Sequence, residues 1–333
     1  MTSEPELTEN FKGIIEKRGR GALEQAKHEI LDSPYDGGVV SSALKYFAQV
    51  TLKDILPVFP ALISLSCEAV GQKTEKTTSI GAALSLITGV ADIHDDIIDK
   101  SAIKYSKQTV FGKFGSDIAL LAGDALLMQG IMLLHRECES LPREQSRAIL
   151  NLTHRALFEI CNAEAKEIGL MKKLDTKPEE YFEVIRLKAV VPEVHCKIGG
   201  ILGNTDEKTV QSLGNYGRTF GIVATVRDEF IDLLEYPELK NRLKNECLPL
   251  PIMYALRNSE IRGKIKPILE SSIITKNNVN EIIKIVMSSE EIQELKNSLK
   301  ILTKEAHRKL AQIVKFKENN NLLMLLKAAS QIF

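Results

Sequence analysis

Apolar residues recur at spacings of three and four along almost the whole chain, while the apolar–polar alternation typical of strands is rare. Glycine and proline stand mostly between the long periodic segments. Because residues three or four apart share one face of a helix, this pattern predicts an all-α protein. We expect long helices over residues 6–31, 53–71, 77–100, 116–139, 142–172, 178–200 and 206–234, and several shorter ones after them.

Three of these segments carry clear start signals. A proline or an N-capping residue, followed by acids, begins the helices near Pro142, Pro178 and Asp206. Pro192 lies inside an otherwise helical pattern and should kink the helix, because it lacks a backbone N–H. Residues 319–321 are all asparagine and predict a turn. The sequence contains no repeat and no linker rich in glycine or serine, so we expect a single domain over residues 1–333.

Composition excludes several classes of protein. The 333 residues include 44 Lys and Arg and 44 Asp and Glu, which gives zero net charge and no sign of a nucleic-acid-binding surface. The five cysteines are widely spaced and form no Cys-x-x-Cys pair, which is typical of reduced thiols in a cytoplasmic protein. The most apolar windows, residues 55–70 and 118–134, are interrupted by polar residues. We therefore expect no transmembrane segment, and the acidic N-terminus predicts no signal peptide.

Four aspartates mark the end of the helix predicted over residues 77–100. Asp92, Asp95, Asp96 and Asp99 are spaced i, i+3, i+4 and i+7, so all four carboxylates share one face. Like charges at these spacings cost roughly 0.2–0.5 kcal/mol per pair, so the four pairings cost on the order of 1–2 kcal/mol unless cations occupy the cluster. Oxygen ligands indicate a hard cation, with Mg²⁺ the usual choice when phosphates complete the coordination.

A second acidic cluster repeats this spacing near the end of another helix. Asp228, Glu229 and Asp232 follow a segment rich in glycine, which predicts close packing. One such cluster alone would be a solvated helix end. Two of them, on apolar helices more than a hundred residues apart, favour a site that holds metal ions and a diphosphate between two acid-tipped helices.

Several segments, in this order, resemble the trans-isoprenyl diphosphate synthase (polyprenyl synthetase) family. They are residues 93–99, 109–110, 113–115 and 121–126 around the first acidic cluster, and residues 221–232 and 248–251 around the second. The resemblance covers roughly residues 53–256. It implies a helical bundle of the isoprenoid synthase type with a central active-site cavity, and a homodimer. It also implies a prenyltransferase that uses Mg²⁺, an allylic isoprenoid diphosphate and isopentenyl diphosphate.

The resemblance assigns roles to the acids. Asp95 and Asp99 match metal ligands of the first region, with Asp96 supporting the same site, and Asp228 and Asp232 match acids of the second region. In the family, magnesium ions bridge both regions and the allylic diphosphate, which leaves to form an allyl cation. Stabilising the departing diphosphate carries most of the catalysis, because negative charge develops there.

The resemblance also assigns contacts with the substrates. Lys188 matches the lysine that contacts the allylic diphosphate, which makes it a catalytic candidate together with Asp95, Asp99 and Asp228. Lys104 stands in place of the first arginine of the family's Arg-Arg pair, and Lys53 in place of the lysine that holds isopentenyl diphosphate. Thr225 stands where a substrate-binding glutamine is usual.

The acceptor site departs most from the family pattern. The usual Gly-Lys-x-x-Arg-Pro reads Leu-Lys-Asp-Ile-Leu-Pro, with Lys53 alone surviving, and Thr88 and Tyr105 replace a His or Gln and the second Arg. Lysine cannot replace the bidentate contacts of a guanidinium. Glu229 also replaces an aspartate, and the loop after Asp232 is shortened. The chain thus resembles an atypical member with a degenerate isopentenyl diphosphate site.

Three hypotheses follow. The chain is a prenyltransferase that elongates an allylic diphosphate, a class I terpene synthase-like enzyme that ionises it without isopentenyl diphosphate, or a non-catalytic subunit of a heteromeric synthase. Asp92 extends the first cluster where an apolar residue is usual, and could serve a different acceptor. Val90 and Ala91 are small where short-chain synthases often carry an aromatic, which favours chains of about twenty carbons or more. His94 falls opposite the acids and predicts a packed core residue.

Overall fold

The computed structural model describes residues 4–34, 37–104, 106–271, 273–313 and 321–330. Its first half contains α1 (Glu4–Leu31), α2 (Gly38–Asp54), α3 (Val58–Ala69), α4 (Lys76–Ile98), β1 (Ile103–Lys104), β2 (Lys107–Gln108), α5 (Val110–Phe114), α6 (Ser116–Glu139) and α7 (Arg143–Leu170). Its second half contains α8 (Pro178–Lys188), α9 (Val190–Leu202), α10 (Glu207–Leu234), α11 (Tyr236–Asn245), α12 (Leu250–Ala255), α13 (Ser259–Leu269), α14 (Lys276–Met287), α15 (Glu290–Ile313) and α16 (Asn321–Ala329). The predicted all-α class is confirmed.

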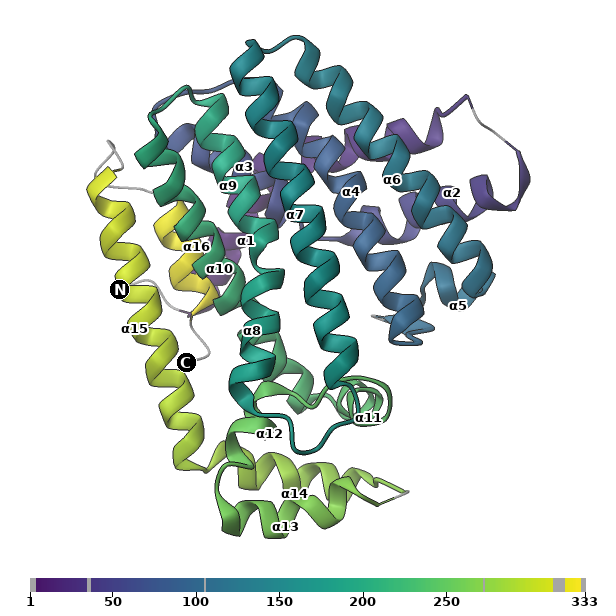
Figure 1. Ribbon diagram of the computed structural model, residues 1–333, viewed down its shortest axis with the longest axis vertical. Coiled ribbons are helices and arrows are strands. Elements are labelled where there is room, and N and C mark those ends of the chain that lie inside the picture. Colours follow the sequence, from purple (N-terminus) through teal and green to yellow (C-terminus); the bar gives the residue numbers. More distant parts are fainter. Residues whose placement is uncertain (1–3, 35–36, 105, 272, 314–320, 331–333) are drawn as a thin grey trace.

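The long helices form a bundle, with α13 and α14 across its lower end and α15 along one side (Figure 1). Helix α4 lies inside the bundle: thirteen of its residues are buried, and it packs against α6, α1 and α3. Its many small side chains let these neighbours approach closely, and the cluster of buried residues around it is the largest in the described chain. The core therefore fixes the helix whose last turns carry the first acidic cluster.

One predicted helix boundary was wrong at the start of the bundle. The sequence pattern predicted one helix over residues 53–71, but α2 ends at Asp54 and α3 begins at Val58. Pro57 accounts for the break, because it has no N–H to continue the helix and forces the residue before it out of the helical region. The helix over residues 38–52 was not predicted. The predicted turn at residues 319–321 lies outside the described residues, except for Asn321, which begins α16.

The helix predicted over residues 178–200 is also divided, at Ala189 between α8 and α9. Pro192 explains the position, since it offers no N–H to the carbonyl of Lys188, four residues earlier, and its ring crowds that carbonyl. The proline therefore breaks the helix about one turn before its own position in the sequence. As a result Lys188 becomes the last residue of α8.

A short hairpin follows the first acidic cluster and was not predicted. Strands β1 and β2 pair antiparallel, with Ile103 opposite Gln108 and Lys104 opposite Lys107. The Tyr46 hydroxyl of α2 donates a hydrogen bond to the Gln108 carbonyl at 2.7 Å, and Lys107 forms an ion pair with Asp54. These contacts hold the hairpin against the end of α2 and so fix the backbone position of Lys104.

Among the described residues, α6 is long and apolar enough to cross a membrane, and α2 with α3 would pass the same test as one span bent by 58°. Helix α6 buries one side against α4 and has an apolar outer side. The five cysteines are free, and four of them are buried.

His195 gives the fold a pH-dependent component. The ring is buried on α9, its Nδ1 lies 2.7 Å from the Val191 carbonyl oxygen, and burial lowers the pKa of His195 to about 4. Between pH 6.5 and pH 4 the unfolded chain takes up a proton here that the folded protein does not, so stability falls as the pH falls through this window. At about 1.4 kcal/mol per pH unit, the loss reaches about 3 kcal/mol.

We therefore expect His195→Phe to remove this component. Urea unfolding at pH 7 and pH 4.5 should show a smaller acid-induced loss of unfolding free energy in the variant than in the wild type. His28, which is exposed, provides the control as His28→Phe. Equal acid sensitivity of wild type and His195→Phe would contradict the prediction.

Candidate active site

The first acidic cluster lies on the last turns of α4. Asp92, Asp95 and Asp96 are within the helix, and Asp99 caps its C-terminal end, with the Asp99 N–H donating to the Asp95 carbonyl at 2.8 Å. The C-terminal end of a helix carries partial negative charge, so carboxylates are unfavourable there. The position of these acids, like their mutual repulsion, favours binding of a cation.

The pKa values of two carboxyl groups in this cluster are also raised. Burial, followed by repulsion from Asp95, Glu246 and Glu167, raises the pKa of Asp99 to about 8. Burial also raises the pKa of Asp92 to about 7, although its side chain is accessible to solvent. Asp92 and its neighbour Ala91 are both exposed at this end of α4.

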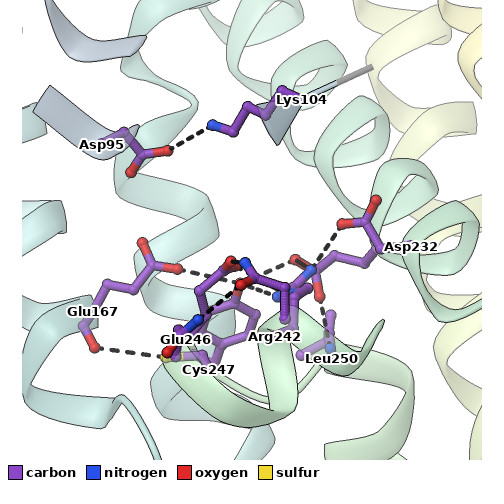
Figure 2. A network of polar contacts seen from close by, with 12 residues as sticks. Asp95, Lys104, Glu167, Asp232, Arg242, Glu246, Cys247 and Leu250 are labelled. Atoms are coloured by element: carbon purple, nitrogen blue, oxygen red, sulfur yellow. Dashed lines mark hydrogen bonds and ion pairs between the residues drawn. The ribbon is translucent and has the colours of Figure 1, made fainter. Parts of the chain in front are cut away.

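Lys104 contacts this cluster from the hairpin. Its Nζ lies 2.8 Å from Asp96 Oδ1 and 3.7 Å from Asp95 Oδ2 (Figure 2). Burial acts to lower the pKa of Lys104, but Asp96 and Asp95 raise it above its usual value, so the ammonium stays charged. The structure thus brings the predicted lysine to the predicted acids.

Lys188 is the last residue of α8. Its Nζ is 3.0 Å from Glu164 Oε1 and forms a second ion pair with Glu167, both on α7. Burial acts to lower the pKa of Lys188, whereas Glu167, Glu164 and Asp95 raise it. Asp95 of the first cluster is thus among the acids that interact electrostatically with Lys188. The two glutamates were missed by the sequence prediction, although their spacing of three on one helix was an available signal.

The second acidic cluster lies on the last turns of α10 and its members differ. The Asp228 side chain is 58% exposed and lies 3.0 Å from Arg227 Nη2. Glu229 is buried, and Asp232 lies 3.0 Å from Nη1 of Arg242, a residue of α11 that the sequence prediction missed. Burial raises the pKa of Asp228, and raises that of Asp232 to about 6.

Glu246 connects the surroundings of the two clusters. Its Oε2 lies 3.7 Å from Arg242 Nε, and burial, with repulsion from Glu238 and Asp95, raises the pKa of Glu246 to about 7. Figure 2 shows Asp95 and Lys104 opposite Arg242 of α11 and Glu246, which directly follows this helix. The first cluster and the helix that contacts the second therefore face the same region.

The structure groups the residues predicted to bind the acceptor less closely than it groups Lys104 with the acids of α4. Lys53 is exposed at the end of α2, next to the Asp54 that pairs with the hairpin, while Thr88 is half-buried in α4. Thr225 is half-buried on α10, one turn before Asp228. Tyr105 lies outside the described residues. His94 faces Gly123 and Asp124 of α6, with its Nε2 3.7 Å from Asp124 Oδ1, and so packs between helices as predicted.

The donor atoms fit magnesium. Both clusters offer carboxylate oxygens, the ligands that Mg²⁺ prefers, and burial together with repulsion between neighbouring carboxylates raises the pKa of Asp99. Within the described part of the chain, no three His, Cys, Asp or Glu side chains are grouped so that they could hold a metal ion by themselves. Magnesium commonly takes only one or two carboxylates and completes its coordination with substrate phosphates and water.

The polyprenyl synthetase family model matches residues 39–286 of the chain. A short chain isoprenyl diphosphate synthase from Methanothermobacter thermautotrophicus is 31% identical over 180 residues, which cover 54% of each chain. The match thus spans about half the length of that relative. Heptaprenyl diphosphate synthase component 2 from Bacillus subtilis is 24% identical over 92% of this chain and 85% of its own.

The crystal structure of geranylgeranyl pyrophosphate synthetase from Pyrococcus horikoshii has the same fold. It superposes with a TM-score of 0.84 and 24% sequence identity, over 97% of this chain and 99% of that one. The structural similarity therefore extends beyond residues 39–286, which the family model matches.

Proposed function

Because the chain belongs to the polyprenyl synthetase family, we propose that it is a magnesium-dependent trans-prenyltransferase of isoprenoid biosynthesis. It ionises an allylic isoprenoid diphosphate and condenses the resulting cation with isopentenyl diphosphate. One observation carries this proposal: two ammonium groups interact with the first cluster, Lys104 through ion pairs with Asp95 and Asp96, and Lys188 through its electrostatic interaction with Asp95. Such a site binds a diphosphate through both metal ions and lysines.

Each residue has a distinct part in this proposal. Asp95, Asp99 and Asp228 would hold the magnesium ions, which on binding neutralise the diphosphate and make it a better leaving group. Lys188 and Lys104 donate charge-assisted hydrogen bonds to the diphosphate oxygens, on which negative charge grows as the carbon–oxygen bond breaks. Asp96 holds Lys104 in place. Glu164 and Glu167 hold Lys188 in the same way.

The acceptor end of the site supports condensation less strongly. Lys53 is the one residue left of the usual diphosphate contacts, and it is exposed. Ionisation without isopentenyl diphosphate, as in a class I terpene synthase, is the second candidate function, and Asp92 favours it. Asp92 adds a carboxyl one turn before Asp95 on the same face of α4, where an apolar residue is usual in the family.

A product assay separates the candidates. Purified protein is incubated with Mg²⁺ and farnesyl or geranylgeranyl diphosphate, with and without isopentenyl diphosphate, and the products are identified by mass spectrometry. A product extended by five carbons supports the prenyltransferase. Release of diphosphate with a hydrocarbon or alcohol, independent of isopentenyl diphosphate, supports the second candidate. Turnover that requires an added partner chain supports a subunit of a heteromeric synthase, such as the name of the Bacillus subtilis relative suggests.

We further propose products of about twenty carbons or more. Val90 and Ala91, five and four residues before Asp95, are small, and each methylene of a longer chain that the protein buries contributes roughly 0.8 kcal/mol. The free, mostly buried thiols support a cytoplasmic location.

The outer side of α6 supports a homodimer. It exposes five large apolar side chains, spaced so that they form one stripe: Leu120, Leu121, Met128, Ile131 and Met132. Contiguous exposed apolar patches are uncommon on monomers and mark interaction surfaces. We expect sedimentation to show a dimer, and Met128→Lys with Met132→Lys to shift it to monomer. Ile273→Lys, at an exposed apolar site between α13 and α14, is the control and should leave the dimer intact. A wild-type protein that is monomeric at micromolar concentration would refute the homodimer.

A further inference from the structure

Arg242 lies at the centre of a buried polar network beside the second acidic cluster (Figure 2). Its side chain is 5% exposed, and its guanidinium donates to Glu229 Oε1 at 2.8 Å and Asp232 Oδ2 at 3.0 Å. It also donates to the Tyr181 hydroxyl of α8 at 2.9 Å. One arginine of α11 therefore connects α8 and α10.

Both carboxylate oxygens of Glu229 already accept hydrogen bonds from the protein. Its Oε1 accepts hydrogen bonds from the Tyr181 hydroxyl and from Arg242, and its Oε2 accepts one from the Leu250 N–H at 2.8 Å. The side chain is as deeply buried as that of Arg242. The glutamate that replaces an aspartate in the second cluster thus serves to connect α10 with α12.

Asp228 differs from both other acids of its cluster. Its side chain is 58% exposed, and the cation beside it, Arg227, is itself partly exposed. Asp232 is intermediate, with one oxygen held by the buried guanidinium and the side chain 32% exposed. The cluster therefore divides into an inner part paired with a protein cation and an outer carboxylate open to the solvent.

We propose that the Arg242 guanidinium takes the place of a metal ion on the second acidic cluster, so that Asp228 is the carboxylate of this cluster that binds magnesium. Arg242 is thus a positioning residue: it fixes Asp232, Glu229 and, through Glu229, the start of α12. Its permanent charge stays paired with these acids whether or not magnesium is present. The part that concerns Asp228 rests on the proposed function. Asp232, a metal ligand by sequence, becomes a partner of Arg242.

Removal of the guanidinium tests the claim that Arg242 takes the place of a metal ion. Arg242→Ala leaves room for a hydrated ion between Glu229 and Asp232, so we expect its melting temperature to be well below that of the wild type in EDTA. Added Mg²⁺, without diphosphate, should recover part of this loss, and should recover none in Arg242→Ala/Asp232→Asn. Arg262→Met, which removes a bond to the Leu256 carbonyl away from any acid, is the control for lost stability without a cation site. Absence of a magnesium response in Arg242→Ala would overturn the proposal.

A second experiment compares variants that retain Arg242, and it tests the proposal even if Arg242→Ala does not fold. Calorimetric titration of Mg²⁺ with inorganic pyrophosphate should show binding at least about tenfold weaker in Asp228→Asn, but within about threefold of the wild type in Asp232→Asn. Equal weakening in both variants would overturn the assignment. A wild type that binds no magnesium with pyrophosphate would contradict the proposed function and the part concerning Asp228, while the melting comparison would still decide the role of Arg242.

Discussion

Asp95→Asn is expected to lower the turnover of allylic diphosphate by about 10³-fold, because it removes a charged metal ligand, and metal stabilisation of a leaving group is worth several kcal/mol. The fold should survive. Asp95 belongs to a repelling cluster at a helix C-terminus, so loss of its charge should leave the melting temperature unchanged or raise it. Pyrophosphate release under saturating Mg²⁺ is the measurement.

The matched control for this substitution is Asp175→Asn, an exposed carboxylate whose nearest cation, Lys266, is 3.9 Å away. Exposed pairs of this kind contribute little, so its turnover and melting temperature should match those of the wild type. Turnover of Asp95→Asn within tenfold of the wild type would remove Asp95 from the site.

Lys188→Met is expected to lower kcat/KM for the allylic diphosphate by about 10–100-fold, since a hydrogen bond to a charged group contributes roughly 1.5–3 kcal/mol. Lys188→Arg keeps the charge and should recover part of the loss. Lys166→Met, at an exposed position of α7, is the control. Steady-state kinetics with varied allylic diphosphate gives the values.

The same variant also tests what the ion pairs with Glu164 and Glu167 do. Without the ammonium, two glutamates remain beside Asp95 with no cation of their own, so part of the loss should come from repulsion of the diphosphate. Lys188→Met/Glu167→Gln should then bind pyrophosphate more tightly than Lys188→Met. If Lys188→Met has wild-type kinetics, the lysine is a surface charge and its contact with the diphosphate is refuted.

The sequence predicted the fold class because a helical period is a local property that survives into the structure. It also predicted that the acids of α4 share one face, since their spacing alone determines this. Strands β1 and β2 could not be predicted in this way, because two-residue strands leave no pattern in the sequence. The divided helices at Pro57 and Ala189 show that a proline can act several residues before its own position.

The site was predictable only where residues adjacent in sequence act together. Arg242 follows Glu229 by thirteen residues and contacts it only because α11 folds back onto α10, and Glu167 meets Lys188 only through the packing of α7 against α8. No spacing rule links such residues. The replacement of an aspartate by Glu229 was visible in the sequence, but its consequence depended on the N–H of Leu250, which folding alone brings into reach.

A crystal structure of the protein with Mn²⁺ and a non-ionisable allylic thiodiphosphate tests the central claim most directly. Anomalous density should place metal ions against Asp95 and Asp99 on one side and Asp228 on the other, with the diphosphate between them and within reach of Lys188. Density for the thiodiphosphate elsewhere, or metal ions that contact none of these carboxylates, would contradict the account.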